Sequence, residues 1–184
     1  MGPASHRWVV FGRDSPNRRG DAISIQATPN SLSHLSVAML VADGFDEQQF
    51  CGAMKMFQTA GCSVQIVSPN SGLVTGALFD RSGHSFMIDR AVDAASGDDF
   101  HILFVPGGAA SVDRLARDGG AAALIAEAIS ADKPVGLVGE GARLLDDAPE
   151  SDDGRLQVRG RTVTAWRDNL GREAAERILE LAGA

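Results

Sequence analysis

Short apolar segments alternate with segments of helical spacing from Leu35 to the end of the chain. Four of the apolar runs are predicted to be strands, at residues 36–41, 63–67, 102–105 and 135–138. Each run is too short for a helix and is bounded by glycine, proline or aspartate. Alternating strands and helices build a parallel sheet that helices cover on both faces. The sequence therefore predicts an α/β fold, a doubly wound sandwich around a mostly parallel central sheet.

Three helices are predicted where apolar residues recur every three or four positions, within residues 50–57, 121–128 and 171–181. One face of each helix is expected to be buried. Gly61 is expected to end the first helix in the left-handed conformation, and Pro134 marks the end of the second. Additional short strands are predicted at residues 73–77, 85–88, 156–158 and 162–165.

Residues 1–34 are predicted to be an arm separate from the domain of residues 35–184. The arm carries two more positive than negative charges, whereas the whole chain has a net charge of -7. Two β-type runs, at residues 7–11 and 22–26, flank a turn-rich stretch and predict a hairpin. A disordered or partner-binding arm is the alternative.

Composition excludes several classes of function. The net charge of -7 opposes binding to nucleic acid, which requires a basic surface. No apolar window is long enough to span a membrane, and the first residues lack the order of charges and apolar residues of a signal peptide. We expect a cytoplasmic protein with no membrane partner and no cofactor.

The cysteines and histidines do not predict a disulfide framework or a metal site. Cys51 and Cys62 lack paired partners at ligand spacing, and so do His84 and His101. Cys51 is expected to be a small buried residue of the first helix. Cys62 follows Gly61 and is expected to be partly exposed, which makes it the better candidate for a redox-sensitive thiol.

Ligands of open α/β sheets bind beyond the carboxyl ends of the strands, so the loops after the strands are the candidate sites. The Gly107-Gly108 turn has two possible interpretations. It is either a nest of backbone amides that binds an anion or simply a tight turn. Asp43, Asp46 and Glu140 either form a carboxylate cluster or lie separately at helix amino ends. Ser111 is expected to cap a helix, because no histidine lies in its loop to act as a base.

Three segments resemble motifs of the DJ-1/PfpI superfamily, the class I glutamine amidotransferase-like proteins: Ala42-Asp43-Gly44-Phe45, Val105-Pro106-Gly107-Gly108 and Lys133-Pro134-Val135 with Gly141. The resemblance covers most of residues 35–166. It implies a flavodoxin-like fold, usually dimeric. Active members use a cysteine at a strand-to-helix elbow, with a histidine next to it and a glutamate from the first helix nearby.

Each of these three reactive positions is occupied by another residue in this sequence. Gly139 stands at the position of the cysteine, Glu140 at that of the histidine and Gln49 at that of the glutamate. A glycine has no nucleophile, and an amide has no useful basicity. We therefore interpret Gln49, Gly139 and Glu140 as a degenerate family site and predict no catalytic residue.

Within the superfamily, the segments around residues 107–112 and 138–145 are most similar to the carboxyl-terminal domain of large-subunit catalases. That resemblance implies a role in oligomer stability or chaperone-like stress protection, with the haem chemistry in a different domain. It also implies a homodimer or higher oligomer, with a client or a catalase-type domain as a further partner.

Two alternatives stay open. One is a hydrolase or a glyoxalase/deglycase-type enzyme that has rebuilt its site from Glu140, Asp43 and the Gly107-Gly108 amides. The other is a small-anion sensor, whose pocket would be formed by Asp43, Gly107, Gly108, Ala109 and Arg143. Arg143 is otherwise expected to pair with a carboxylate.

Overall fold

The computed structural model describes residues 9–10, 32–79, 81–148, 156–166 and 171–183. The described strands form a large sheet in the order β1-β10-β11-β9-β8-β2-β4-β7 and a small sheet in the order β3-β5-β6. The strands of the large sheet are β1 (Val9–Val10), β2 (Ser36–Leu40), β4 (Ser63–Ser68), β7 (Arg90–Ala91), β8 (Ile102–Val105), β9 (Val135–Val138), β10 (Leu156–Arg159) and β11 (Thr162–Ala165). Those of the small sheet are β3 (Phe45–Asp46), β5 (Leu73–Leu78) and β6 (Arg81–Met87).

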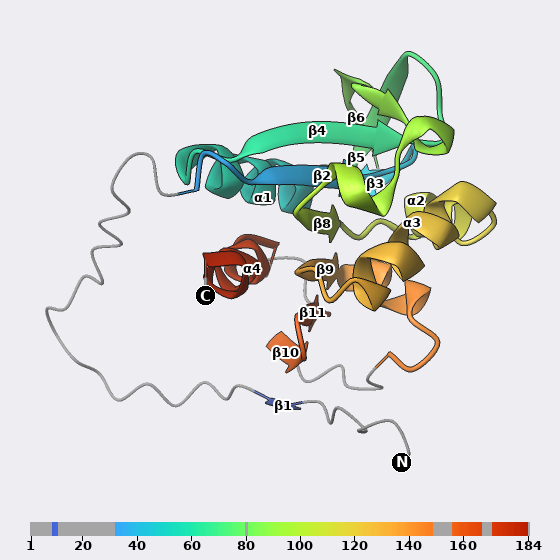
Figure 1. Ribbon diagram of the computed structural model, residues 1–184. Coiled ribbons are helices and arrows are strands. Elements are labelled where there is room, and N and C mark those ends of the chain that lie inside the picture. Colours follow the sequence, from blue (N-terminus) through green and yellow to red (C-terminus); the bar gives the residue numbers. More distant parts are fainter. Residues whose placement is uncertain (1–8, 11–31, 80, 149–155, 167–170, 184) are drawn as a thin grey trace, which may run out of the picture.

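Among the described residues, four α-helices cover the large sheet: α1 (Glu47–Thr59), α2 (Ala109–Leu115), α3 (Gly119–Ser130) and α4 (Gly171–Gly183). Three short 3-10 helices are present at Val92–Ala94, Gly97–Asp99 and Gly139–Leu144. In Figure 1, α1 and α4 lie on one side of the sheet, and α2 and α3 lie on the other. The strands from β11 to β7 pair in parallel, whereas β10 pairs with β11 and β1 in antiparallel fashion. The predicted α/β sandwich with a mostly parallel central sheet is therefore confirmed.

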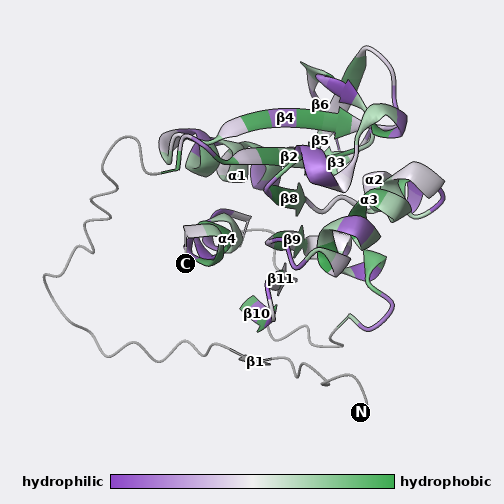
Figure 2. Ribbon diagram, viewed as in Figure 1, coloured by the Kyte–Doolittle hydropathy of each residue, from purple (hydrophilic) through white to green (hydrophobic). Residues whose placement is uncertain are grey.

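Alternate residues of the central strands enter two separate cores, because neighbouring side chains of a strand point to opposite faces. On the α1 and α4 face, Val37 and Met39 of β2 pack with Phe50 and Ile178. On the opposite face, Leu40 packs in the cluster that contains Leu124 and Ile125 of α3. Figure 2 shows hydrophobic residues along most of β2, as expected for a strand that is buried on both faces.

Most predicted element bounds agree with the structure to within one residue. Gly61 has a φ of +89° and follows the end of α1, as predicted. The largest difference is β6, which begins at Arg81 rather than at residue 85. Residues 81–85 are polar and mostly exposed, so their pairing with β5 depends on backbone hydrogen bonds. They show no alternation of apolar residues from which a strand could be predicted.

The arm contributes one strand to the large sheet. Val9 and Val10 pair in antiparallel fashion with Val158 and Gln157 of β10. The predicted hairpin partner, residues 22–26, lies outside the described residues. Leu32, near the end of the arm, packs against the core that contains Val37, so the described end of the arm contacts the domain.

Candidate functional site

The loops that follow β2, β8 and β9 meet at the carboxyl edge of the parallel sheet. The amide of Asp46 donates to the carbonyl of Gly107 at 2.8 Å, which joins the first two loops. Gly108 has a φ of +103°, and a Cβ at this position would overlap the backbone of Gly44. Only glycine permits both the conformation and the close approach, so the Gly107-Gly108 turn is required for the loops to pack.

Gly139 occupies the elbow at which β9 ends. Its φ of +55° lies in the left-handed region, where a side chain other than glycine would be strained. A Cβ built at this position would lie 3.1 Å from the side-chain nitrogen Nε2 of Gln49. The elbow therefore has the backbone conformation of a sharp turn without any side chain to present there.

Gln49 and Glu140 occupy the two amides of the glycine turn. Gln49 is only 2% exposed, and its Oε1 accepts a hydrogen bond from the amide of Gly107 at 2.8 Å. The Oε2 of Glu140 accepts from the amide of Gly108 at 2.9 Å. In this structure the amides considered above as an anion nest therefore bind side chains of the chain itself.

The side-chain nitrogen of Gln49 has no hydrogen-bond partner among the described residues although it is buried. A buried polar group that lacks a partner costs about 1–3 kcal/mol unless water satisfies it. This nitrogen faces the position where a Cβ of residue 139 would be. The amide of Gln49 thus has one end fixed on the glycine turn and the other directed at the elbow.

Two of the three carboxylates of these loops, those of Asp43 and Asp46, accept hydrogen bonds from nearby residues. Asp46 is the N-cap of α1, and its Oδ1 accepts from the amide of Gln49 at 2.9 Å. Asp43 accepts from the amide of Thr75 at 2.8 Å and from the side chain of Asn70 at 2.5 Å. In the part of the chain that the structure describes, no group of three potential metal ligands is found. The helix-end interpretation holds for Asp46, whereas Asp43 binds β5 and the segment after β4.

A hollow of about 360 Å³ lies beside the elbow. Its walls are formed by loop residues and by the tip of the small sheet: Gly44, Asp46, Gln48, Ala77, Phe79, Gly108, Ala109, Ala110 and Glu140. Of the predicted pocket residues, Gly108 and Ala109 line this hollow. Asp43 lines a neighbouring hollow instead. Arg143 is directed at Asp113, at 3.6 Å, which fits the expected pairing with a carboxylate.

Sequence reasoning missed Gln48 and Phe79 as lining residues. Phe79 is 84% exposed and has a φ of +56°, which is unusual for an aromatic residue. It follows β5 at the hairpin that leads into β6. No local pattern marks this hairpin tip as close to the loops after β2 and β8, so no sequence signal could have identified it.

Three predictions about nucleophilic side chains require correction. Ser111 does not cap α2, because it lies inside this helix, and its buried hydroxyl accepts from the amide of Ala42 at 3.0 Å. Cys51 is exposed and Cys62 is buried, the reverse of the prediction. Cys51 follows Phe50, which faces the core, so the helix turns it toward solvent. Cys62 packs in the core before β4, at the amino edge of the sheet and opposite the elbow.

Both thiols have a raised pKa. Partial burial of the sulfur, and next the negative charge of Glu47, raise the pKa of Cys51. Burial also raises the pKa of the Cys62 thiol. A reactive cysteine requires a lowered pKa, so neither residue has the environment of a family nucleophile.

Glu47, at the start of α1, binds His84 of β6. Its Oε2 accepts from the amide of His84 at 2.7 Å, and its Oε1 lies 2.6 Å from the ring Nδ1. Burial raises the pKa of the Glu47 carboxyl, but the bonds and charge of His84 outweigh it, and the pKa is lowered overall. A Cβ on Gly83 would overlap the carboxylate. These contacts between the buried carboxylate of Glu47 and the exposed His84 fix the small sheet on α1.

None of the described helices combines the length and the apolar character that are needed to cross a membrane.

The comparisons with known proteins agree with this architecture. The family model of the DJ-1/PfpI family matches residues 35–177. The chain is 29% identical over 146 residues to Deglycase TK1284 of Thermococcus kodakarensis, covering 78% of this chain and 81% of that protein. It is 27% identical over 129 residues to Protein/nucleic acid deglycase 2 of Escherichia coli, covering 70% and 69%.

The solved structure of oxidized DJ-1 from Toxoplasma gondii matches with a TM-score of 0.67. It covers 80% of this chain and 96% of that one at 15% identity. This likeness concerns the fold, whereas the family is shown by the match to its model. That match extends from just before β2 into α4 and includes all three loops of the site, and the chain accordingly belongs to the DJ-1/PfpI family.

Proposed function

We propose that this chain is a DJ-1/PfpI-family domain that acts by binding rather than by covalent catalysis. Its role would be oligomer stabilisation or chaperone-like stress protection, similar to that of the carboxyl-terminal domain of large-subunit catalases. The observation that carries the proposal is the bonding at the elbow. Gln49 and Glu140 occupy the amides of Gly107 and Gly108, while Gly139 presents no side chain.

Thiol chemistry of the family type requires a nucleophile beside a proton acceptor, together with free donors for the developing oxyanion. Cys62 is buried at the amino edge of the sheet, and Ser111 is buried and bonded to Ala42. The two nearest amides already donate to side chains. These features disfavour the alternative of a deglycase or hydrolase with a rebuilt site.

The small sheet supports the oligomeric part of the proposal. Leu73 and Met87 are directly opposite each other in the register of β5 and β6, and they are 56% and 74% exposed. Phe79 is a further exposed apolar side chain, at the opposite end of β5 from Leu73. Exposed apolar surface of this kind is typical of protein interaction sites. We infer that the β5–β6 face contacts a second copy of the chain or a client.

The first experiment measures turnover of methylglyoxal and of a peptide ester. Wild-type protein and the Glu140→Gln variant are both expected to show no turnover above the buffer. A complementary experiment uses the double variant Gly139→Cys with Gln49→Glu, which introduces a thiol and a carboxyl group at the elbow. It is expected to add a thiol that iodoacetamide modifies faster than Cys51. Turnover by wild type that is lost in Glu140→Gln would contradict the proposal.

The second experiment measures light scattering by a heat-denatured model protein. Wild-type protein is expected to suppress the scattering at stoichiometric concentration. The Met87→Lys variant is expected to suppress it less, because it places a charge on the apolar face. If wild-type protein does not suppress the scattering and is also monomeric, a stabilising or chaperone-like role is ruled out.

A further inference from the structure

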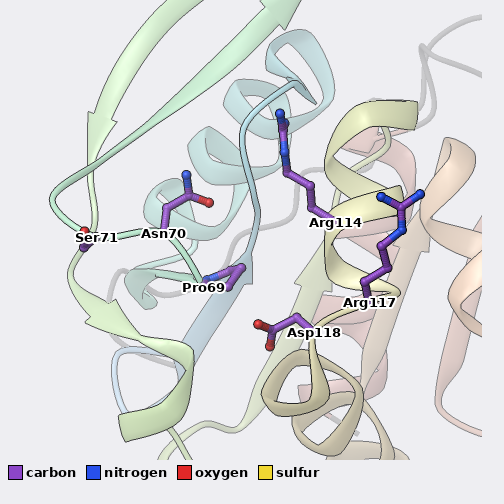
Figure 3. Close-up of a pocket in the computed structure, with 6 residues that line it drawn as sticks. All are labelled: Pro69, Asn70, Ser71, Arg114, Arg117 and Asp118. Atoms are coloured by element: carbon purple, nitrogen blue, oxygen red, sulfur yellow. The ribbon is translucent and has the colours of Figure 1, made fainter.

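A second hollow, of about 600 Å³, lies at the carboxyl end of β4 and is separate from the elbow. Six residues line it: Pro69, Asn70, Ser71, Arg114, Arg117 and Asp118. In Figure 3, Pro69 and Asn70 lie on one side, and the two arginines and Asp118 lie across from them, at the end of α2 and the start of α3. None of the residues that line the elbow hollow is shared with it.

The arginines of this hollow lack acidic partners. Neither Arg114 nor Arg117 forms an ion pair with a carboxylate of the described residues. Five other described arginines each pair with an aspartate or glutamate: Arg90, Arg143, Arg159, Arg172 and Arg177. Arg114 and Arg117 line the same side of one hollow, and their guanidinium groups have no carboxylate partner among the described residues. Together they offer two positive charges to an anion.

The local contacts position these groups. Arg114 donates to the backbone carbonyl of Asp43, which fixes its side chain over the end of β2. The remaining N–H groups of Arg114, and the whole guanidinium of Arg117, stay available. A guanidinium group binds a phosphate by two parallel charge-assisted hydrogen bonds.

The rest of the lining offers hydrogen-bond acceptors. The side-chain nitrogen of Asn70 donates to Asp43 at 2.5 Å, and no donor to the amide oxygen of Asn70 is found among the described residues. One carboxylate oxygen of Asp118 accepts from the amide of Ala121 at 2.8 Å, and the other is not used there. The hydroxyl of Ser71 can accept or donate. Acceptors beside a pair of cations favour a ligand that has both an anionic group and hydroxyl groups.

We propose that this hollow binds a hydroxylated phosphate monoester. The phosphate would face Arg114 and Arg117, and the hydroxyl groups would donate to Asn70 and Asp118. A phosphate monoester has a charge between about -1.5 and -2 at pH 7, which matches two guanidinium groups. A volume of about 600 Å³ lies within the usual range for small-molecule sites.

The test is isothermal titration calorimetry of the full chain with glycerol 3-phosphate, inorganic phosphate and glycerol. Glycerol 3-phosphate is expected to bind saturably to wild type and at least tenfold more tightly than inorganic phosphate. Glycerol is expected not to bind. The affinity should also fall as sodium chloride is raised, because the contact is ionic.

Arg117→Gln and Arg114→Gln are expected to weaken the binding of glycerol 3-phosphate at least tenfold. Arg172→Gln, on the exposed surface of α4, is the matched control and should bind like wild type. Arg117 has an exposed side chain, so its variant is expected to keep the circular dichroism spectrum and melting temperature of wild type. The proposal is overturned by equal affinity for inorganic phosphate and glycerol 3-phosphate, by unchanged affinity in a folded Arg117→Gln variant, or by the lack of saturable binding.

Discussion

At the residue scale, the elbow is characterised by two side chains that accept hydrogen bonds from the backbone. Gln49 and Glu140 each bind an amide of the Gly107-Gly108 turn. The family resemblance predicts that three reactive positions are replaced, but it does not predict these bonds. Gln49 and Gly107 are separated by 58 residues, and only the packing of α1 on the loop after β8 brings them together. Local residue patterns contain no information on such contacts.

Glu47 leads to a prediction of pH dependence. Its folded pKa is below the ordinary value of 4.5, so its stabilising effect is fully present above about pH 4.5. The effect is lost as the pH falls through the folded pKa, because protonation weakens the bonds with His84. Glu47→Gln is expected to lower the free energy of unfolding by about 1–3 kcal/mol at pH 7. This loss should shrink toward pH 3.

Urea denaturation of wild type and Glu47→Gln at pH 7 and at pH 3 measures the loss of unfolding free energy at each pH. Asp132→Asn is the matched control, since Asp132 is exposed and has a φ of +53°, which asparagine also tolerates. The control should show little change at either pH. A loss in Glu47→Gln that is equally large at pH 3 would show that the carboxylate charge is not responsible.

At the element scale, the interface between β9 and α4 depends on the absence of one side chain. A Cβ on Gly136 would overlap Ile178 of α4 and lie 2.8 Å from Phe104 of β8. The helix therefore rests directly on the backbone of the strand. The sequence predicts both elements, with β9 at its observed bounds, but a glycine in a short apolar run gives no indication of which helix covers it.

Gly136→Ala is expected to lower the free energy of unfolding by about 1–3 kcal/mol, because the added methyl group forces α4 away from β9. Gly52→Ala in α1 is the matched control. A Cβ there meets no atom within 4 Å, and alanine favours the helix over glycine by about 0.5–1 kcal/mol. Thermal unfolding should therefore move in opposite directions for the two variants. A shift in the same direction would contradict this account of the interface.

The β5–β6 face leads to a prediction about assembly. Leu73→Lys is expected to shift the chain toward the monomer, since a lysine would replace an exposed apolar contact opposite Met87. Ile129→Lys on α3 is the matched control, because Ile129 is also an exposed apolar residue, at 38%, on a different element. Sedimentation velocity over a range of concentrations measures the result. Equal dissociation in both variants would place the contact elsewhere, and a monomeric wild type would rule out a contact between two copies.

At the scale of the whole molecule, the alternation of strands and helices was sufficient to predict the layered α/β fold. Strands β8 and β9 are buried along their whole length, and this produces continuous apolar runs such as residues 102–105. The exposed strand β6 and the elbow hollow could not be predicted from the sequence, because both depend on polar or backbone contacts between distant segments. The exposure of the cysteines was assigned in reverse, although the buried face of α1 at Phe50 and Ala53 already directs Cys51 outward.

The unlike environments of the two cysteines make the native chain suitable for site-specific fluorescence labelling. A maleimide dye should couple at Cys51 on the surface of α1, while Cys62 stays shielded in the core. No engineered cysteine and no cysteine deletion would be required. Energy transfer between donor-labelled and acceptor-labelled copies could then report subunit exchange in real time with the unmodified sequence.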